Sequence, residues 1–497
     1  MDSNHNLIKQ VVIVGGGIAG LATAYTLQER ARAEGLPIAY TLLESSPNLG
    51  GKIVTDREEG FVIEGGPDSF LAQKPWAAQL AQALGLEQDL IGTNQEQKKL
   101  FVVHRGRLTP MPDGVMLIIP TRFMPFITSS LISWPGKIRM GMDFFIPRRK
   151  DDADESVGNF IRRRLGKEAL EKIAEPLMSG IHVSDPEMQS LLGTFPRFRT
   201  LEKQHGSLIR GMLAQRRAAR SNGETAPTSE KNSWKSSVFV SFRGGMRQLV
   251  QALEKSLKED QIKTSCPVTE ILPLPEGGYQ VSTAKGETLH ADAVVMATPA
   301  FVSSLLVSDF APELSSALKT IRYVSTATVS LAFRKSEVGN PLNGVGFIIP
   351  RRENRRISAC TINSTKFSSR AAEGQILLRC FLGGPGHEEV VEHSDTEIIA
   401  DVRAELEALM GIRAEPILTR VYRWIKGNAQ YDVDHLERVK KMHTMCAEIP
   451  GLFLTGSAYE GIGVPDCIHQ GQQAAEKVLV FLQEHERRTQ FAVTTGQ

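Results

Sequence analysis

The sequence predicts an α/β fold, α+β in its overall composition, in which a Rossmann-like unit is joined to a mixed-sheet part and a helical part. Residues 9–44 follow the order strand, glycine-rich turn, helix, strand, which is typical of a β-α-β unit. Short apolar runs return far along the chain at 292–298 and 452–455 and predict further buried strands. Alternating apolar stretches predict a separate sheet, at residues 326–333, 346–349 and 376–380.

The first β-α-β unit follows from its residue pattern. Residues 10–14 (QVVIV) form a short apolar run, as expected of a strand buried on both faces. Residues 21–32 contain good helix formers with few breakers. Residues 38–44 (IAYTLLE) predict a second strand, and this strand ends in the carboxylate of Glu44. Farther along, residues 74–84 and 156–174 have helical spacing, so we expect 75–205 to be mainly helical.

Composition excludes several classes of function. The chain has 497 residues, which at about 150 residues per domain suggests about three domains. The 58 basic and 56 acidic residues leave a net charge of +2, so we expect no nucleic-acid partner. The five cysteines include no C-x-x-C pair and no H-E-x-x-H occurs, so neither a disulfide framework nor a metal site is expected. An apolar run starts at Val11 without a preceding targeting signal, so we expect a cytoplasmic location.

Two kinds of segment bear on surface contacts. The apolar run 123–136 (FMPFITSSLISWPG) is only 14 residues long and contains two prolines, whereas a transmembrane helix needs about 20 apolar residues. We expect a buried helix or loop there, and the alternative is a channel mouth or a peripheral membrane contact. The charge runs at 151–155, 162–164 and 351–356 are expected to be solvated, and the alternative is a patch that guides an anionic ligand.

The motif Gly15-x-Gly17-x-x-Gly20 carries the first chemical signal. It follows a strand and opens a helix, and Glu44 ends the next strand, which is the context of a dinucleotide-binding fingerprint. Gly15 permits the tight turn, Gly17 lets the backbone approach a pyrophosphate, and Gly20 allows close packing of helix on strand. Glu44 would accept hydrogen bonds from ribose hydroxyls and disfavours a 2′-phosphate, so NADP is not expected. The cofactor-binding residues expected in this unit are Gly15, Gly17, Ile18, Ala19, Gly20, Glu44 and Ser45.

Two further glycine pairs follow, in Gly50-Gly51-Lys52 and in Gly65-Gly66-Pro67-Asp68. Together with the first motif, these segments resemble the superfamily of FAD-containing amine oxidases and protoporphyrinogen oxidases. The resemblance implies FAD as the cofactor and a p-hydroxybenzoate-hydroxylase-like fold. Asn48 and Lys52 stand where the family often has arginine, and lysine cannot make the bidentate phosphate contacts of arginine.

Later segments resemble the same superfamily in the same order along the chain. Val268 and the run 292–299 resemble its later FAD-domain strands, and the resemblance implies that the Val268 backbone pairs with adenine. Residues 455–467 resemble its C-terminal flavin segment, in which a helix N-terminus points at the N1–C2=O edge of the isoalloxazine and stabilises negative charge there. The additional cofactor-binding residues that the resemblance implies are Gly50, Gly51, Lys52, Gly65, Gly66, Pro67, Asp68, Val268, Thr298, Trp424, Gly456, Ile462, Gly463 and Val464.

A narrower resemblance concerns the substrate. Residues 175–181 (EPLMSGI), with Ser184-Asp185, resemble the helical-domain signature of porphyrinogen oxidases, as do 66–70 and Gln430-Tyr431, and the match is best to the type found in Gram-positive bacteria. The resemblance implies a six-electron oxidation of a porphyrinogen in haem synthesis, in which FAD takes hydride and O₂ reoxidises it with release of H₂O₂. The alternatives are an amine or carotenoid oxidase on the same scaffold, or an escort protein that has lost flavin chemistry.

The substrate residues are also expectations from this resemblance. Leu100 stands where plant and mitochondrial-like enzymes carry an arginine that pairs with a propionate, which favours coproporphyrinogen III over protoporphyrinogen IX. No catalytic side chain is assigned, because the N–H groups of the macrocycle can release the protons. The expected substrate contacts are Gly180 lining the cleft, Phe367 stacking on the macrocycle (or packing as ordinary core), Ile348, and Lys74 or Arg197 on a propionate.

The resemblance also implies a domain arrangement in which one domain is assembled from separate segments. Its predicted parts are an FAD-binding domain (1–74, 206–300 and 426–485), a mainly helical domain with the membrane or channel-mouth face (75–205), a substrate-binding domain (301–425), a flexible loop (216–235) and a C-terminal tail (486–497). A hand-off of the porphyrin to another haem-pathway enzyme is a further expectation, and the oligomeric state stays open.

Overall fold

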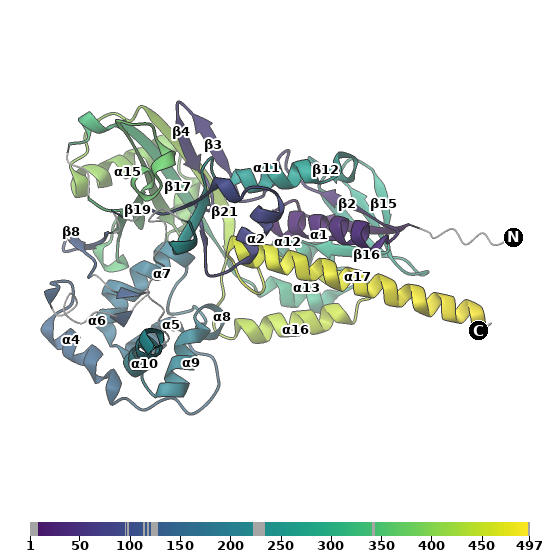
Figure 1. Ribbon diagram of the computed structural model, residues 1–497, viewed down its shortest axis with the longest axis horizontal. Helices are drawn as coiled ribbons and strands as arrows, with labels where there is room; N and C mark the ends of the chain where they lie inside the picture. Colours follow the sequence, from purple (N-terminus) through teal and green to yellow (C-terminus); the bar gives the residue numbers. More distant parts are fainter. Residues whose placement is uncertain are drawn as a thin grey trace.

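The computed structural model describes residues 8–94, 96, 99–112, 115–116, 119–120, 128–221, 234–339 and 343–495. The first part is built on a parallel sheet of five strands in the order β12-β2-β1-β16-β22. These strands are β1 (Lys9–Val14), β2 (Ile38–Leu43), β12 (Ile262–Lys263), β16 (Ala293–Met296) and β22 (Leu452–Leu454). The prediction that separated segments form buried parallel strands is confirmed. Figure 1 shows this part on the right, with both termini at its outer end.

Strand β1 is buried on both faces because helices cover both sides of the sheet. Val11 and Ile13 belong to one core, with α1 (Ile18–Glu34), α11 (Arg247–Ser256) and α17 (Val464–Thr495). Val12 and Val14 belong to a second core on the opposite face. That core also contains α12 (Ala300–Leu306), α13 (Pro312–Lys319), α16 (His435–Ala447) and part of the antiparallel sheet β13 (Val268–Pro273), β14 (Tyr279–Thr283) and β15 (Thr288–Ala291).

A mixed sheet of seven strands forms the second part, in the order β21-β17-β20-β19-β18-β7-β8. Its strands are β7 (Leu100–His104), β8 (Arg107–Pro110), β17 (Tyr323–Arg334), β18 (Gly346–Ile348), β19 (Ala359–Ile362), β20 (Gln375–Gly383) and β21 (Leu418–Ala429). Phe347 faces the core beneath α15 (Asp395–Met410), whereas the next residue, Ile348, faces the helical part. The strands expected at 326–333, 346–349 and 376–380 are confirmed. Strands β7 and β8, however, come from the segment expected to be mainly helical.

The helical part lies below the seven-stranded sheet in Figure 1. It consists of α4 (Trp134–Gly141), α5 (Val157–Arg164), α6 (Lys167–Ala169), η3 (Leu170–Ala174), α7 (Glu175–His182), α8 (Leu191–Thr194), α9 (Pro196–His205) and α10 (Leu208–Ser221). The helix expected at 156–174 is interrupted at Gly166, whose φ is 92°. Apart from short 3₁₀ turns, the remaining described helices and strands are α2 (Trp76–Ala83), α14 (Asn363–Lys366), β3 (Thr55–Glu58), β4 (Phe61–Glu64), β5 (Phe70–Leu71), β6 (Leu90–Gly92), β9 (Val115–Met116), β10 (Ile119–Pro120) and β11 (Phe239–Phe242).

Two boundary expectations are wrong. The polar segment 216–235 was expected to be a loop, but 216–221 end helix α10 and 234–235 belong to a 3₁₀ turn, while 222–233 lie outside the described residues. The segment 486–497 was expected to be a tail, but α17 continues to Thr495. Polar residues alone did not end either helix, because no glycine or proline occurs within 216–221 or within 486–495 to stop it there.

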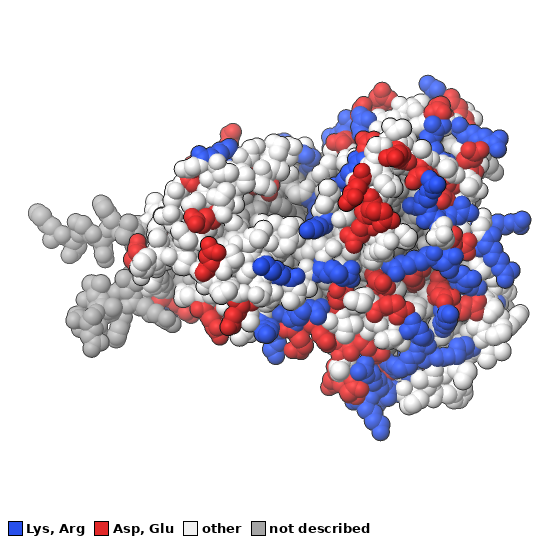
Figure 2. All heavy atoms as spheres, turned by 180° about the vertical axis from the view of Figure 1, so that it is seen from behind, with Lys and Arg blue, Asp and Glu red and all other residues white. Residues whose placement is uncertain are grey.

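The charge runs are mostly paired rather than free. Figure 2 shows acidic and basic side chains intermingled over the part with the seven-stranded sheet and the helical part. Arg164, expected to be solvated, is fully buried and pairs with Asp143, which also accepts hydrogen bonds from Ser207 Oγ and Ile209 N. In the run 351–356, each arginine pairs with a carboxylate: Arg351 with Glu175 and Asp185, Arg352 with Glu171, Arg355 with Glu405 and Arg356 with Asp401. These runs therefore offer no unpaired patch for an anionic ligand.

The apolar segment 123–136 is only partly visible, since 123–127 lie outside the described residues. Residues 134–136 open helix α4. Among the helices that the structure describes, none is both long and apolar enough to cross a membrane.

Candidate flavin site and substrate wall

The glycine-rich turn between β1 and α1 has the geometry of a dinucleotide site. Gly15 has a φ of 109°, and a Cβ there would lie 2.8 Å from the Ala297 carbonyl oxygen. A Cβ on Gly20 would lie 1.9 Å from the Gly15 carbonyl oxygen, so only glycine lets the helix approach the strand this closely. A Cβ on Gly17 would meet nothing within 4 Å. The N-terminus of α1 therefore faces open space at Gly17, where its free N–H groups can receive a phosphate.

Glu44 joins the end of β2 to this turn. Its Oε2 accepts a hydrogen bond from Gly16 N at 2.7 Å, and its Oε1 accepts from Ser46 N at 2.7 Å and from Ser45 Oγ at 3.1 Å. The carboxylate keeps further acceptor positions, because two oxygens offer about four lone-pair sites. Glu44 and Ser45 therefore lie together at the carboxyl end of β2, where a ribose would bind.

Gly50-Gly51-Lys52 packs directly on the first turn. Gly50 N donates to the Gly16 carbonyl at 2.8 Å, and a Cβ on Gly51 would lie 3.2 Å from Gly17 Cα. Burial lowers the pKa of the Lys52 ammonium, and none of the described residues forms an ion pair or a hydrogen bond with it. A partly buried cation without a counter-charge is costly. An anionic pyrophosphate between Gly17 and Lys52 would supply that charge, so the residues present fit FAD.

The segment Gly65–Asp68 is held from the seven-stranded sheet. The Gly65 carbonyl accepts three hydrogen bonds, from Trp424 Nε1 at 3.0 Å, from Arg379 Nη2 at 2.8 Å and from Thr328 Oγ1 at 3.3 Å. A Cβ on Gly66 would lie 1.7 Å from the Lys52 carbonyl oxygen, so the segments Gly50–Lys52 and Gly65–Asp68 also touch. Trp424 thus reaches the expected cofactor region by fixing the backbone of this segment.

Asp68 forms the charged centre of the same segment. Both of its carboxylate oxygens accept hydrogen bonds from Lys366 Nζ, at 2.9 and 2.8 Å. Burial opposes ionisation of Asp68, but the charges of Lys366 and the buried Arg379 outweigh it and hold the pKa of the carboxyl below its usual value. Asp68 is therefore ionised and ties α14 and β20 to the segment that follows Pro67.

The distant cofactor residues lie at the same edge of the parallel sheet. Thr298, just after β16, lies next to Gly15, since its Cγ2 would be 3.3 Å from a Cβ there. Val268 opens β13 two residues after Cys266, whose N–H donates to the Glu44 carbonyl at 2.8 Å. The structure thus brings these residues to the carboxyl ends of the parallel strands, where α/β sheets bind their ligands.

Residues 455–463, here called the C-terminal turn, connect β22 to α17. Gly456 has a φ of 120°, and a Cβ there would meet nothing within 4 Å. Gln470 holds the turn from α17, because its Oε1 accepts from Glu460 N and its Nε2 donates to the Gly461 carbonyl. Gly463 and Val464 stand at the N-terminus of α17. That helix end presents a positive dipole at the point where the resemblance puts the flavin.

The structure brings together only two of the expected substrate residues. Gly180 on α7 and Ile348 on β18 face each other, since a Cβ on Gly180 would lie 3.5 Å from Ile348 Cγ2. Phe367 is only 1% exposed and packs among Lys366 and Arg370, so the expectation that it stacks on a macrocycle is not met by this packing. We call Gly180 and Ile348, together with Val183, the first residue after α7, the substrate wall.

Neither cation expected on a propionate is free. Lys74 Nζ lies 2.7 Å from both carboxylate oxygens of Asp466, near the start of α17. Arg197 donates to Gln215 Oε1 at 2.6 Å. The Lys74 partner is 392 positions away in the chain, so the sequence alone does not reveal this pairing.

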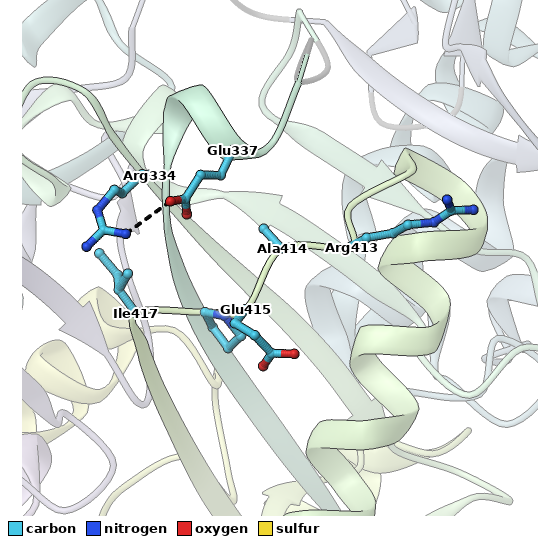
Figure 3. Close-up of a pocket in the computed structure, with 7 residues that line it drawn as sticks. Arg334, Glu337, Arg413, Ala414, Glu415 and Ile417 are labelled. Atoms are coloured by element: carbon cyan, nitrogen blue, oxygen red, sulfur yellow. Dashed lines mark hydrogen bonds and ion pairs between the residues drawn. The ribbon is translucent and has the colours of Figure 1, made fainter.

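One surface depression of about 670 Å³ lies elsewhere, between the ends of β17 and β21 (Figure 3). Its charged side chains are paired, Arg334 with Glu337 at 3.0 Å, Arg413 with Glu407 at 2.7 Å, and Glu415 with Arg403. None of the expected site residues lines it.

Sequence reasoning missed Arg379, Lys366 and Tyr431 as site residues. Arg379 stands alone as a charge within the apolar run 376–380, and a charge on a buried strand is the signal that marks it. Lys366 carries no comparable local signal, and Tyr431 was noted only as part of the resemblance to porphyrinogen oxidases, without a role in the site. Their partners, Asp68 and the C-terminal turn, are close to them only in the folded chain.

Comparisons with known proteins agree with this geometry. Residues 18–479 match the family model described as flavin containing amine oxidoreductase. The chain is 39% identical to coproporphyrinogen III oxidase of Bacillus subtilis over 477 residues, which covers 95% of this chain and 98% of that protein. It is 35% identical to coproporphyrinogen III oxidase of Staphylococcus aureus (96% and 100% covered) and 28% identical to protoporphyrinogen oxidase 2 of Arabidopsis thaliana (96% and 94% covered).

Solved structures give the same result. The crystal structure of "Putative protoporphyrinogen oxidase from Exiguobacterium sp. 255-15" superposes with a TM-score of 0.83 at 33% identity and covers 97% of this chain and all of that one. A putrescine oxidase structure at 18% identity superposes with a TM-score of 0.65 and shares the fold. The predicted fold class and flavoprotein superfamily are thereby confirmed. The chain belongs to the family of flavin-containing amine oxidoreductases.

Proposed function

We propose that this protein is an FAD-dependent porphyrinogen oxidase of haem synthesis that converts coproporphyrinogen III to coproporphyrin III with O₂ as acceptor and H₂O₂ as by-product. The observation that carries the proposal is the contact of the first three glycine segments around the open face of Gly17 and the unpaired Lys52, with the C-terminal turn following β22 at the same edge of the parallel sheet. The full-length similarity to coproporphyrinogen III oxidases supports the choice of substrate class. Protoporphyrinogen IX, with the same chemistry, is the alternative substrate.

When bound, FAD would supply the redox chemistry, as the hydride acceptor for the porphyrinogen and the electron donor to O₂. The protein's own residues bind and orient it. Lys52 and the N-terminus of α1 would neutralise the pyrophosphate, and Glu44 would accept hydrogen bonds from ribose. The N-terminus of α17 would stabilise negative charge on the reduced ring.

The substrate wall would orient the macrocycle without reacting with it. Gly180 leaves room for a flat ligand next to Ile348, since a larger residue at 180 would project toward that side chain. We assign no side chain as a general base. Positioning is therefore the main contribution of the protein to the rate.

The test compares coproporphyrinogen III and protoporphyrinogen IX as substrates of the purified flavoprotein, with porphyrin fluorescence and peroxide as readouts. The proposal predicts faster turnover of coproporphyrinogen III. Turnover of an amine without any porphyrinogen activity would establish another oxidase. A chain that neither contains nor binds flavin would establish an escort protein.

We further propose a cytoplasmic protein that touches membranes peripherally through α4 and the turn after it. Four exposed apolar side chains are spaced along one side of this segment: Trp134, Ile138, Met142 and Phe145. The exposed fractions of Trp134 and Phe145 are 65% and 84%. Lys137 lies 4.7 Å from the centre of the Trp134 ring. An exposed apolar stripe with a tryptophan and an adjacent cation is typical of an interfacial helix on anionic lipid.

Co-sedimentation with phosphatidylglycerol vesicles tests this contact. The double variant Trp134→Ser/Phe145→Ser should lose vesicle binding and keep its thermal stability, because both side chains are exposed. Leu305→Ser, at an equally exposed residue of α12 (66% exposed), is the matched control and should bind as the wild type does. Equal binding by the wild type and the double variant would contradict the proposal.

A further inference from the structure

We infer that Gln430 and Tyr431 are a pair of positioning residues that set the spacing between the C-terminal turn and the substrate wall. The inference rests on the proposed function, in which the flavin binds at the turn and the macrocycle at the wall. The two residues follow β21 directly, and the backbone N–H of Gln430 donates to the Arg322 carbonyl at 2.8 Å. Both side chains are buried, so neither is available for solvent.

Tyr431 holds the C-terminal turn at two points. Its hydroxyl donates to the Ser457 carbonyl at 3.1 Å and accepts from Gly461 N at 2.7 Å. The single oxygen therefore bridges the two ends of the segment 457–461. Burial, first of all, raises the pKa of Tyr431 well above its ordinary value, so the hydroxyl keeps the proton that it donates.

His435 fixes the tyrosine ring. The two rings are stacked, with centroids 3.7 Å apart and planes 12° apart. The Nε2 of His435 lies 2.8 Å from the Tyr459 carbonyl oxygen, a further contact with the same turn. Tyr431 therefore cannot swing away from the turn without disturbing a buried stack.

The side chain of Gln430 contacts the segment that follows α7, on the side away from the C-terminal turn. Its Nε2 donates to the Val183 carbonyl at 3.1 Å and to the Asn428 carbonyl at 3.3 Å. Val183 has a φ of 49°, a conformation that β-branched residues rarely adopt and that needs support from its surroundings. Gln430 supplies that support at the end of the helix that carries Gly180.

Backbone pairing keeps these two contacts at a fixed separation. Ser190 N donates to the Tyr431 carbonyl at 2.7 Å, and Val433 N donates to the Met188 carbonyl at 2.8 Å. The short segment 430–433 is thus bonded on one side to the helical part and on the other to the C-terminal turn. Successive side chains of an extended chain point to opposite sides, so the dipeptide Gln430-Tyr431 can bind the segment after α7 with one side chain and the C-terminal turn with the other.

The experiment measures two separate properties of the purified holoenzyme. Tyr431→Phe removes the hydroxyl that holds the turn, so the N-terminus of α17 should move away from the flavin and the midpoint potential of the flavin should fall. The Kd of the Tyr431→Phe variant for coproporphyrin III should stay within about twofold of the wild-type value, since the substrate wall keeps its support. Gln430→Met should show the reverse: the potential should be unchanged and the Kd should rise roughly tenfold, the effect expected of one lost buried hydrogen bond.

Matched variants separate positioning from general loss of stability. Tyr279→Phe loses a buried hydroxyl bond to the Pro450 carbonyl, and Gln28→Met loses the bond from Gln28 Nε2 to the Ser256 carbonyl, in the C-terminal half of α1. Both controls should lower the melting temperature without changing the potential or the Kd. The inference is overturned if Tyr431→Phe leaves the potential unchanged, or if the two test variants change the same property.

The proposed function is tested separately in the same preparation. Wild-type protein that binds FAD but neither oxidises nor binds porphyrin would refute the proposed function. The potential of Tyr431→Phe would then decide the present inference on its own, since that readout needs no porphyrin.

Discussion

Replacing Gly17 by alanine should separate cofactor binding from folding. Gly17 has a φ of −69° and a ψ of 175°, an extended conformation that any residue adopts, and a Cβ there meets no atom within 4 Å. The free energy of unfolding of the apoprotein should therefore change by less than about 1 kcal/mol. The added methyl group can only obstruct a bound group, and pushing the pyrophosphate off the helix N-terminus would cost about 1.5–3 kcal/mol per lost charge-assisted hydrogen bond.

The expected result is a Kd for FAD that rises by roughly 10- to 100-fold, measured by titrating apoprotein with FAD while following tryptophan fluorescence. Gly17→Val, with a larger side chain, should abolish flavin retention during purification. Thermal unfolding of each apoprotein checks that the fold is intact.

Two other glycines provide the controls. Gly141 on α4 also has a negative φ of −60° and open space at its Cβ position, so Gly141→Ala should leave FAD binding unchanged. Gly20→Ala should destabilise the apoprotein itself by several kcal/mol, on the order of 3 or more, because its Cβ would overlap the Gly15 carbonyl. If Gly17→Ala bound FAD as tightly as the wild type, the pyrophosphate would not lie at this helix N-terminus and the reasoning would be refuted.

Four further variants test the electrostatics of the described site and core. Burial raises the pKa of Glu175 from 4.5 to about 7, so between these pH values Glu175 is ionised in the unfolded chain and protonated in the folded chain. The free energy of unfolding should therefore fall as the pH rises through this range, by up to about 3 kcal/mol. Glu175→Gln should remove this slope from urea unfolding measured as a function of pH. Burial lowers the pKa of His435 from 6.5 to about 4, so stability should instead fall as the pH drops through that window, and His435→Gln should abolish this loss. Lys52→Met should weaken FAD binding on the order of tenfold yet raise the melting temperature of the apoprotein, because it removes an unpaired, partly buried cation. A lower melting temperature would contradict the assignment. Asp68→Asn should cost about 3 kcal/mol in chemical unfolding, since it leaves Lys366 without its counter-charge, and a neutral effect would show that the pair contributes nothing.

Local signals were sufficient for the nucleotide-binding core. The runs 11–14 and 293–296 are uniformly apolar because both faces of the parallel sheet are covered, and glycine is required where Gly20 approaches Gly15. These constraints act within a few residues, so they leave a pattern in the sequence. The predicted glycines therefore converge on one edge of the sheet.

Long-range pairing left no such pattern. Strand β7 joins the seven-stranded sheet through Leu100, which pairs in register with Gly346. No sequence pattern near either residue predicts this pairing. The sequence around Phe367 looks the same whether the ring packs in a core or stacks on a ligand, and only the burial of the ring in the folded chain distinguishes the two. Lys74 is engaged by Asp466 for a similar reason: the two residues meet only after α17 has packed against the parallel sheet.

The most direct test of the account is an anaerobic mixing experiment with coproporphyrinogen III and the purified yellow protein. If the bound flavin takes the electrons, its visible absorbance should bleach as porphyrin fluorescence appears, and admission of O₂ should restore the colour with formation of H₂O₂. Porphyrin formation while the flavin stays oxidised, or no porphyrin beyond the rate of spontaneous oxidation, would contradict the assignment of this chain as an FAD-dependent porphyrinogen oxidase.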